Sequence, residues 1–280
     1  MPFNGTFFDP SGRAASLLKD GAAKTLAALR FYSRLPLPVF SFEREPFALP
    51  DLARLAPYAP LAGAIIGASG AIVLALARAL GLPALVSAAL ALSALVVISG
   101  AFHEDGLADV CDGLGGGATR ERKLEIMRDS RIGAFGGAAL ALSLLIRAAA
   151  IAALVGEGAR IGVASLVVAG AFARACGLAP MALLDPARAD GTGASVGRLE
   201  TGAFSKSVLT ALVIAAILGI VVLGFGRTLL ACLLAAAAAL AMTAVARRQI
   251  GGQTGDVAGA AEQLAEIAFL CGLLIGAGDP

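Results

Sequence analysis

Three aspartates recur at helical spacing in the segment HEDGLADVCDG, residues 103–113. If this segment is helical, Asp105, Asp109 and Asp112 share one narrow face, while Glu104 points to one side. Like charges this close repel one another, and a hard cation bound by carboxylate oxygens relieves the repulsion. The spacing therefore predicts a Mg²⁺ site on Asp105, Asp109 and Asp112, and the adjacent Glu104 is a further candidate ligand. The alternative is a solvated acidic loop.

A basic segment, TRERKLEIMRDSRIG at residues 119–133, follows the acidic one. Arg128 and Arg131 lie one helical turn apart, on either side of Ser130. Two guanidinium groups at this spacing can clamp phosphate oxygens in bidentate fashion. The alternative is a positive charge that only signals membrane topology.

A third polar segment, GGQTGD at residues 251–256, is rich in glycine. Its backbone N–H groups favour anions, so Thr254 and Gly255 are candidate substrate-binding residues. Asp256 is a candidate metal ligand or general base. Glu262 and Glu266 follow at an interval of four inside an apolar stretch, and they should face the interior of a helical bundle.

Two arginines also lie inside apolar stretches. Arg147 and Arg174 should each find an acidic partner, a ligand phosphate or the membrane interface. Arg174 is nearer the middle of its stretch and is the better candidate for substrate binding. His103, the single histidine, adjoins the carboxylates and is a candidate supporting partner or general base. No serine or cysteine has the base and orienting group that a nucleophile needs.

The elements that position these residues are membrane helices. The chain is 58% hydrophobic with a mean hydropathy of +0.85, and only 15% of its residues are charged. A helix needs about 20 residues to cross the hydrocarbon core. We expect an all-α polytopic membrane bundle of six or seven transmembrane helices, at residues 58–79, 83–102, 132–155, 160–184, 207–224, 228–246 and, more weakly, 257–278.

Lysine and arginine set the expected orientation. Seventeen of them lie in the N-terminal region and the long connections, and three lie in the short turns. Because cytoplasmic loops carry the excess of basic residues, the long connections and the N-terminus are expected inside. All three polar segments then fall on one side of the membrane and can form one site.

The rest of the chain adds fewer constraints. Residues 1–12 are expected to be disordered, and residues 13–280 to form a single membrane domain. It begins with an amphipathic helix at 14–31 that is expected to lie on the membrane surface; the alternative is an ordinary cytoplasmic helix. The formal charge of +2 excludes a typical nucleic-acid binder. The four cysteines are far apart, which argues against a zinc site or a disulfide framework.

Four motifs together resemble the cobalamin synthase family, the adenosylcobinamide-GDP ribazoletransferases. They are FYSRLPLP at 31–38, GAFHEDGLADVCDG at 100–113, EIMRDSRIGAFG at 125–136 and GGQTGDVAGAAEQLAE at 251–266. The resemblance runs from about residue 25 through nearly the whole chain. It implies a Mg²⁺-dependent enzyme in a bacterial cytoplasmic membrane that joins adenosylcobinamide-GDP to α-ribazole, or to its 5′-phosphate, and releases GMP.

The resemblance also suggests roles for the candidate residues. Asp105, Asp109 and Asp256 are expected to be catalytic. The expected substrate-binding residues are Arg34, Arg128, Ser130, Arg131, Arg174, Thr254 and Gly255. The partners would be the two substrates and the lipid bilayer, and the resemblance leaves open a homo-oligomer or a complex with other cobamide-assembly enzymes.

Two other function classes compete with this one. A CDP-alcohol phosphotransferase also carries aspartates at membrane helix ends, but its motif continues in an order that is absent here. A transporter should hold its charges near the bilayer midplane on broken helices. The expected position of the charges at one interface favours an enzyme.

Overall fold

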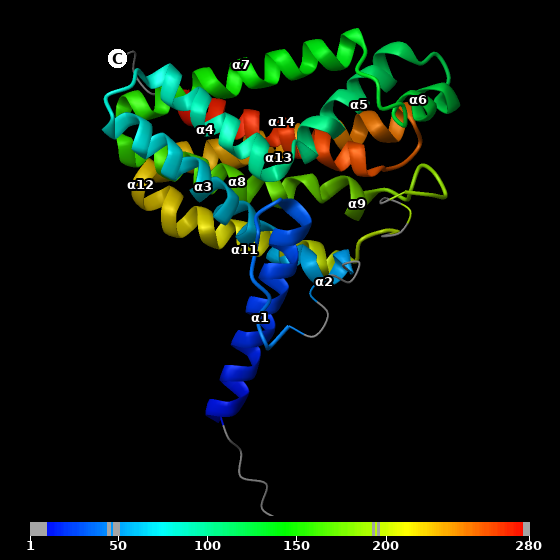
Figure 1. Cartoon of the computed structure of the whole chain (residues 1–280). Coiled ribbons are helices and arrows are strands. Elements are labelled where there is room, and N and C mark those ends of the chain that lie inside the picture. The colour runs from blue at the N-terminus through cyan, green and yellow to red at the C-terminus, as the bar shows by residue number, and fades with distance from the viewer. Residues whose placement is uncertain (1–9, 44–45, 47–50, 192–193, 195–196, 277–280) are drawn as a thin grey trace, which may run out of the picture.

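The computed structural model describes residues 10–43, 46, 51–191, 194 and 197–276. These ranges form a helical bundle (Figure 1). Most of the expected disordered segment 1–12 lies outside the described residues, and the first helix already begins at Pro10. The helices are α1 (Pro10–Tyr32), α2 (Leu52–Leu55), α3 (Ala59–Ala79), α4 (Ala84–Ser99), α5 (Phe102–Gly116), α6 (Arg120–Ile126), α7 (Ala134–Glu157), α8 (Ala159–Gly177), α9 (Ala179–Leu183), α11 (Thr201–Ile214), α12 (Val221–Leu223), α13 (Phe225–Gln249) and α14 (Gly255–Leu274), with a 3₁₀ turn at Ala56–Tyr58 and a π-helical stretch at Ala215–Ile220.

The described part of the chain contains six helices that are long and apolar enough to cross a membrane. The pair α4 and α5 adds a seventh span if the two are counted as one bent element. This confirms the expected polytopic all-α bundle. The weak seventh apolar stretch forms a spanning-length helix, α14, because its two glutamates face the interior rather than lipid.

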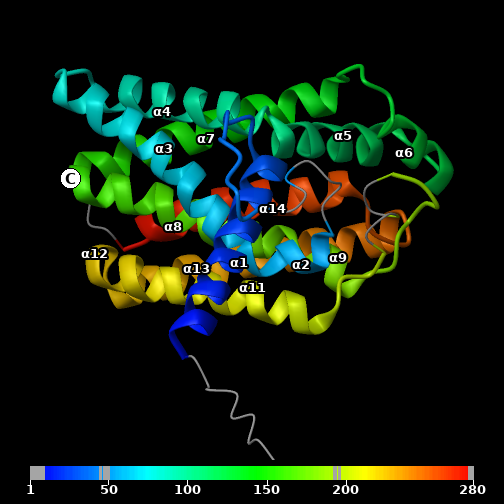
Figure 2. The ribbon, with the colours of Figure 1, turned by 60° about the horizontal axis from the view of Figure 1, so that its bottom comes forward.

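The bundle is arranged around α8 and α14, which are the most buried of the candidate spans. Helices α3, α4, α7, α11 and α13 surround them (Figures 1 and 2). The outer helices expose large apolar side chains, as expected of surfaces that face lipid tails. Examples on four outer helices are Ile72, Leu145, Leu209 and Leu233.

The polar connections gather at one end of the bundle, on the right in Figure 1. Helices α5, α6 and α9 lie there, and so do the first turns of α11 and α14. The short turns after α3, α7 and α12 lie at the opposite end, together with the C-terminal end of α14. Helix α1 runs crosswise to the spans in both views (Figures 1 and 2). Its last turns are anchored by buried Ala28, Leu29 and Tyr32.

Glycines bring α3 and α8 into close contact. A Cβ atom on Gly63 or Gly67 would overlap backbone atoms of Gly170 or Leu166, and a Cβ on Gly170 would lie 2.5 Å from the carbonyl oxygen of Gly63. Small residues of this kind let helix backbones approach closely in lipid, where association depends on packing rather than on the hydrophobic effect. Gly63 and Gly67 are four residues apart and therefore lie on the same face of α3, the face that contacts α8.

We therefore expect Gly67→Leu to lower stability by roughly 1–3 kcal/mol, because the new side chain must push α3 and α8 apart. The measurement is the midpoint of thermal unfolding in detergent. The matched control is Gly226→Leu, also in a helix, where a side chain would meet nothing within 4 Å. Equal midpoints for the two variants would contradict the packing argument.

Candidate active site

A sharp bend between α4 and α5 places the acidic segment at the end of the bundle. The two helices meet at 88°. Gly100 and Ala101 both adopt left-handed backbone conformations, with φ of 66° and 57°, which end α4. The acidic segment is helical, but its helix is not a straight continuation of α4, because two left-handed residues cannot continue an α-helix.

Arg34 holds this bend from outside. Its backbone N–H donates to the carbonyl of Ile98 at 2.7 Å, in the last turn of α4. Its guanidinium lies so close to Gly100 that a Cβ atom there would overlap it. Arg34 therefore contacts the structure that orients α5, and only glycine leaves room for it.

Three carboxylates from two helices come together beyond the bend. Asp105 is exposed on α5, and Asp109 and Asp256 are half-buried on α5 and α14. The charge of Asp109 interacts unfavourably with those of Asp105 and Asp256. Helices α5 and α14 approach closely at Gly106, where an added Cβ would lie only 2.8 Å from the backbone oxygen of Asp256. The charges of the three residues expected to be catalytic therefore interact, and their catalytic role stays a prediction.

Arg188 provides a positive charge at this cluster. Its Nη2 atom lies 2.6 Å from Oδ2 of Asp256. The Thr254 hydroxyl donates to the same oxygen at 3.1 Å and accepts from the N–H of Val257, which caps α14. Sequence reasoning missed Arg188, because it was counted only as a topology signal in the 185–206 connection.

The glycine-rich turn is fixed by neighbouring connections. Gln253 donates its N–H to the carbonyl of Asp185 at 2.9 Å and accepts from the N–H of Ala187 at 2.8 Å. Arg120 donates to the carbonyls of Ile250 and Ala187, both at 2.7 Å. Arg120 was another residue that the sequence did not single out. The N–H groups of Gly251 and Gln253 both donate within the chain, so of the glycines expected to bind an anion, Gly251 already has a partner.

Glu104 and Asp112 lie elsewhere than the metal-ligand prediction assumed. Asp112 is buried and accepts from the backbone N–H groups of Gly133 and Gly136, at 2.7 and 2.8 Å, at the start of α7. A carboxylate at a helix N-terminus satisfies donors that lack partners in the helix. Glu104 points into the bundle, where it pairs with Arg147 at 2.9 Å.

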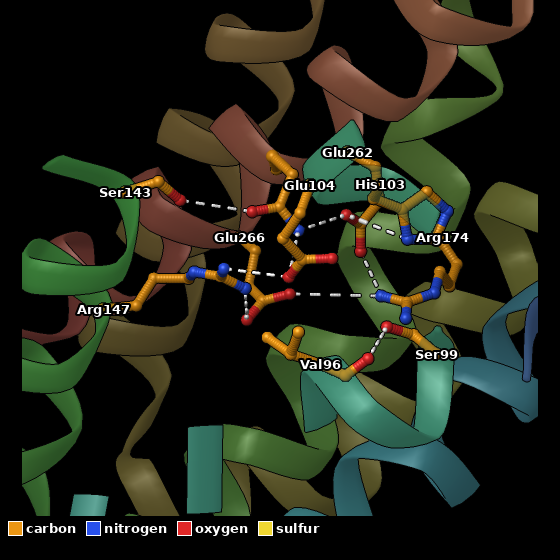
Figure 3. A network of polar contacts seen from close by, with 10 residues as sticks. Val96, Ser99, His103, Glu104, Ser143, Arg147, Arg174, Glu262 and Glu266 are labelled. Carbon is orange, nitrogen blue, oxygen red and sulfur yellow. Dashed lines mark hydrogen bonds and ion pairs between the residues drawn. The ribbon is translucent and has the colours of Figure 1, made fainter. Parts of the chain in front are cut away.

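A buried ionic network of arginines and glutamates lies inside the bundle (Figure 3). Arg147 on α7 lies 2.9 Å from Glu104 and 3.4 Å from Glu266. Arg174 on α8 pairs with Glu262 and lies 4.0 Å from Glu266. The two arginines have therefore found acidic partners, and the two glutamates of α14 face the interior as expected. His103 Nδ1 lies 3.4 Å from Glu262.

The expected phosphate clamp lies at the surface. Arg128 pairs with Asp190, while Arg131 lies 2.5 Å from Asp129. Hydrogen bonds from Arg131 lower the pKa of Asp129 to about 2. Ser130 is exposed between them. Both guanidinium groups are thus accessible, and each is paired with a carboxylate from which a phosphate would have to displace it.

Comparison with known proteins identifies the family. A family model described as "Cobalamin-5-phosphate synthase" matches residues 24–274. The chain belongs to this family. It is 51% identical over 249 residues to an adenosylcobinamide-GDP ribazoletransferase of Azorhizobium caulinodans, covering 89% of this chain and 94% of the relative. It is 53% identical over 258 residues to the protein of that name from Xanthobacter autotrophicus, covering 91% and 96%. No solved structure matches the chain.

The buried network yields a stability prediction. Arg147→Gln leaves Glu104 and Glu266 without their shared cation, and removing one partner of a buried pair costs about 3–5 kcal/mol. We expect a large drop in the thermal midpoint in detergent. Adding Glu104→Gln should restore part of it, because one unpaired charge is then removed.

The control is Arg160→Gln, an exposed arginine at the other end of the bundle, which should change stability by less than about 0.5 kcal/mol. A double variant no more stable than Arg147→Gln alone would show that the pairing of Glu104 with Arg147 does not stabilise the fold.

Proposed function

We propose that this protein transfers the adenosylcobinamide phosphate group from adenosylcobinamide-GDP to α-ribazole or its 5′-phosphate, and releases GMP. The observation that carries the proposal is the cluster of Asp105, Asp109 and Asp256 with Arg188, at one end of a membrane bundle of this family. The relatives named above bear the name of this activity.

The reaction forms one P–O bond and breaks another. The ribose 3′-hydroxyl of the acceptor attacks the cobinamide-side phosphorus, and the bond from that phosphorus to the oxygen of GMP breaks. The hydroxyl proton passes to a carboxylate of the cluster. Asp256 is the candidate base, because Thr254 and Arg188 hold one of its oxygens and orient the group. Arg188 is also within reach to neutralise phosphate oxygens.

The donor set fits Mg²⁺, which we propose as the cofactor. The cluster offers only oxygen ligands, and the like charges of Asp105, Asp109 and Asp256 interact unfavourably, which a bound cation would relieve. The described residues contain no group of three side chains placed to hold an ion by themselves. This suits Mg²⁺, which proteins usually bind through one or two carboxylates together with substrate phosphates and water. Asp105 and Asp109 would hold the ion, which when bound neutralises charge on the pyrophosphate.

Phosphate contacts extend from this cluster. Arg128 and Arg131 are candidates for outer phosphate oxygens, since both are exposed on the same end of the bundle. Arg34 and Arg174 are placed differently from Arg128 and Arg131. Arg34 lies against the bend before α5, and Arg174 is buried behind the cluster.

We further propose that the protein lies in the bacterial cytoplasmic membrane with the active site and the N-terminus on the cytoplasmic side. The basic residues support this orientation, since most of them lie at the end that holds the cluster. The crosswise direction of α1 supports an interfacial helix on that face.

The test is GMP release by the purified protein in liposomes, with adenosylcobinamide-GDP, α-ribazole 5′-phosphate and Mg²⁺. We expect EDTA to abolish release and Asp105→Asn to reduce kcat by about 100-fold or more, because a group at the reacting phosphate is lost. Asp20→Asn, which removes the same charge from an exposed position on α1, is the control.

Release that survives EDTA and Asp105→Asn would keep the transferase but refute the metal site. No GMP from well-folded wild-type protein would refute the proposed reaction.

A further inference from the structure

A recess lies beside the carboxylate cluster, between the end of α1, the start of α5, the end of α8 and the start of α14. The centres of water-sized molecules can occupy about 40 Å³ of it. Its walls are mostly apolar and include Phe31, Tyr32, Phe102, Leu178 and Met181.

Aromatic rings shape one side of the recess. The rings of Phe31 and Phe102 meet edge to face, with centroids 5.5 Å apart, and those of Tyr32 and His103 lie 5.8 Å apart at a tilt of 33°. Ring pairs in these arrangements are energetically favourable, which helps to hold this wall in place. A wall made in this way suits a flat aromatic ring.

One residue that lines this apolar space carries a buried donor without a partner. Arg174 lines the recess and is 6% exposed. Its Nη1 atom is taken by Glu262 and Glu266, but its Nε atom has no hydrogen-bond partner in the described part of the chain. A buried donor left unpaired is unfavourable, so an acceptor brought by a ligand would be favoured there.

We propose that this recess binds the planar base of the acceptor, the benzimidazole of α-ribazole, and that Arg174 Nε donates to its free ring nitrogen. The proposal rests on the proposed function. A benzimidazole joined to ribose has apolar faces, one acceptor nitrogen and no donor, which matches an aromatic recess with one unpaired donor.

The guanine of the donor substrate fits this recess poorly. Its edge carries N–H donors that need acceptors, and the nearest carboxylate, Glu262, is already held by Arg174 and His103. The corrin ring with its side chains is much larger than the space. The recess therefore discriminates by chemistry as well as by size.

The position of the recess also suits the reaction. Phe102 lies three residues before Asp105 on α5, and residues at this spacing are about 5–6 Å apart on one helix face. Gly255 lines the recess and immediately precedes Asp256. A base held here would place its ribose next to the carboxylates that receive the hydroxyl proton.

The test uses the absence of tryptophan from the chain. Phe102→Trp puts one fluorophore in the recess, and Phe225→Trp puts one at the far end of the bundle, where Phe225 is exposed. Each variant is titrated in detergent with α-ribazole alone and with GMP alone. We expect a saturable emission change for Phe102→Trp with α-ribazole, and only the loss caused by light absorption for Phe225→Trp.

Equal responses of the two variants to α-ribazole would overturn the proposal, and a larger saturable response to GMP would show that the recess holds guanine. Phe31→Trp serves on the same wall if Phe102→Trp does not fold. Since this binding needs no turnover, its failure is distinct from failure of the transfer reaction.

A second measurement tests the hydrogen bond. The α-riboside of indole has the same shape, but a C–H replaces the acceptor nitrogen. We expect the wild-type protein to bind it about tenfold more weakly than the matching α-riboside of benzimidazole, the usual effect of one lost hydrogen bond in a buried site. Equal affinities would refute the role of Arg174 Nε.

Discussion

Two arginines buried among three glutamates hold the bundle together directly beneath its polar end. Arg147 and Arg174 connect α7 and α8 to α5 and α14 through Glu104, Glu262 and Glu266. Burying a charge inside a membrane protein is energetically costly unless the charge is paired, so the loss of any one arginine or glutamate leaves a partner unpaired. Because Glu104 lies immediately before Asp105, the same network fixes how α5 turns and which face its aspartates present.

The bend before α5 determines where that face lies. A straight continuation of α4 would carry the aspartates along the direction of the span. The left-handed residues Gly100 and Ala101 instead turn the chain by 88°, so that α5 lies beside the first turn of α14. Arg34 holds the bend from the segment after α1. The bend at Gly100 and Ala101 thus brings the motif at 100–113 into contact with Arg34 of the motif at 31–38 and with the start of α14 in the motif at 251–266.

The site and the recess share their walls. Helices α5 and α14 contribute carboxylates on one side and Phe102 and Gly255 on the other. The buried network stands behind both, since Arg174 belongs to it and also lines the recess. In the proposed reaction the recess orients the acceptor, and the carboxylates and Arg188 act at the phosphate. Positioning and charge provide most of the catalysis of phosphoryl transfer, and this arrangement provides both.

The sequence by itself determined the membrane class, most of the spans and the chemistry of the polar segments. The length of an apolar segment is set by the thickness of the membrane, and the spacing of Asp105 and Asp109 by the period of a helix, so both can be recognised locally in the sequence. The sequence also indicated that Glu262 and Glu266 face the interior of the bundle, since charged side chains avoid lipid. Only the tertiary structure decided which carboxylates meet.

Glu104 and Asp112 have the same chemistry as Asp105, and their positions follow from partners more than 20 residues away, Arg147 and the start of α7. Arg188 and Arg120 gave no sequence signal beyond their charge, because their contacts join connections distant along the chain. Spacing along one helix is written in the sequence, whereas pairing between helices depends on how close their backbones pack.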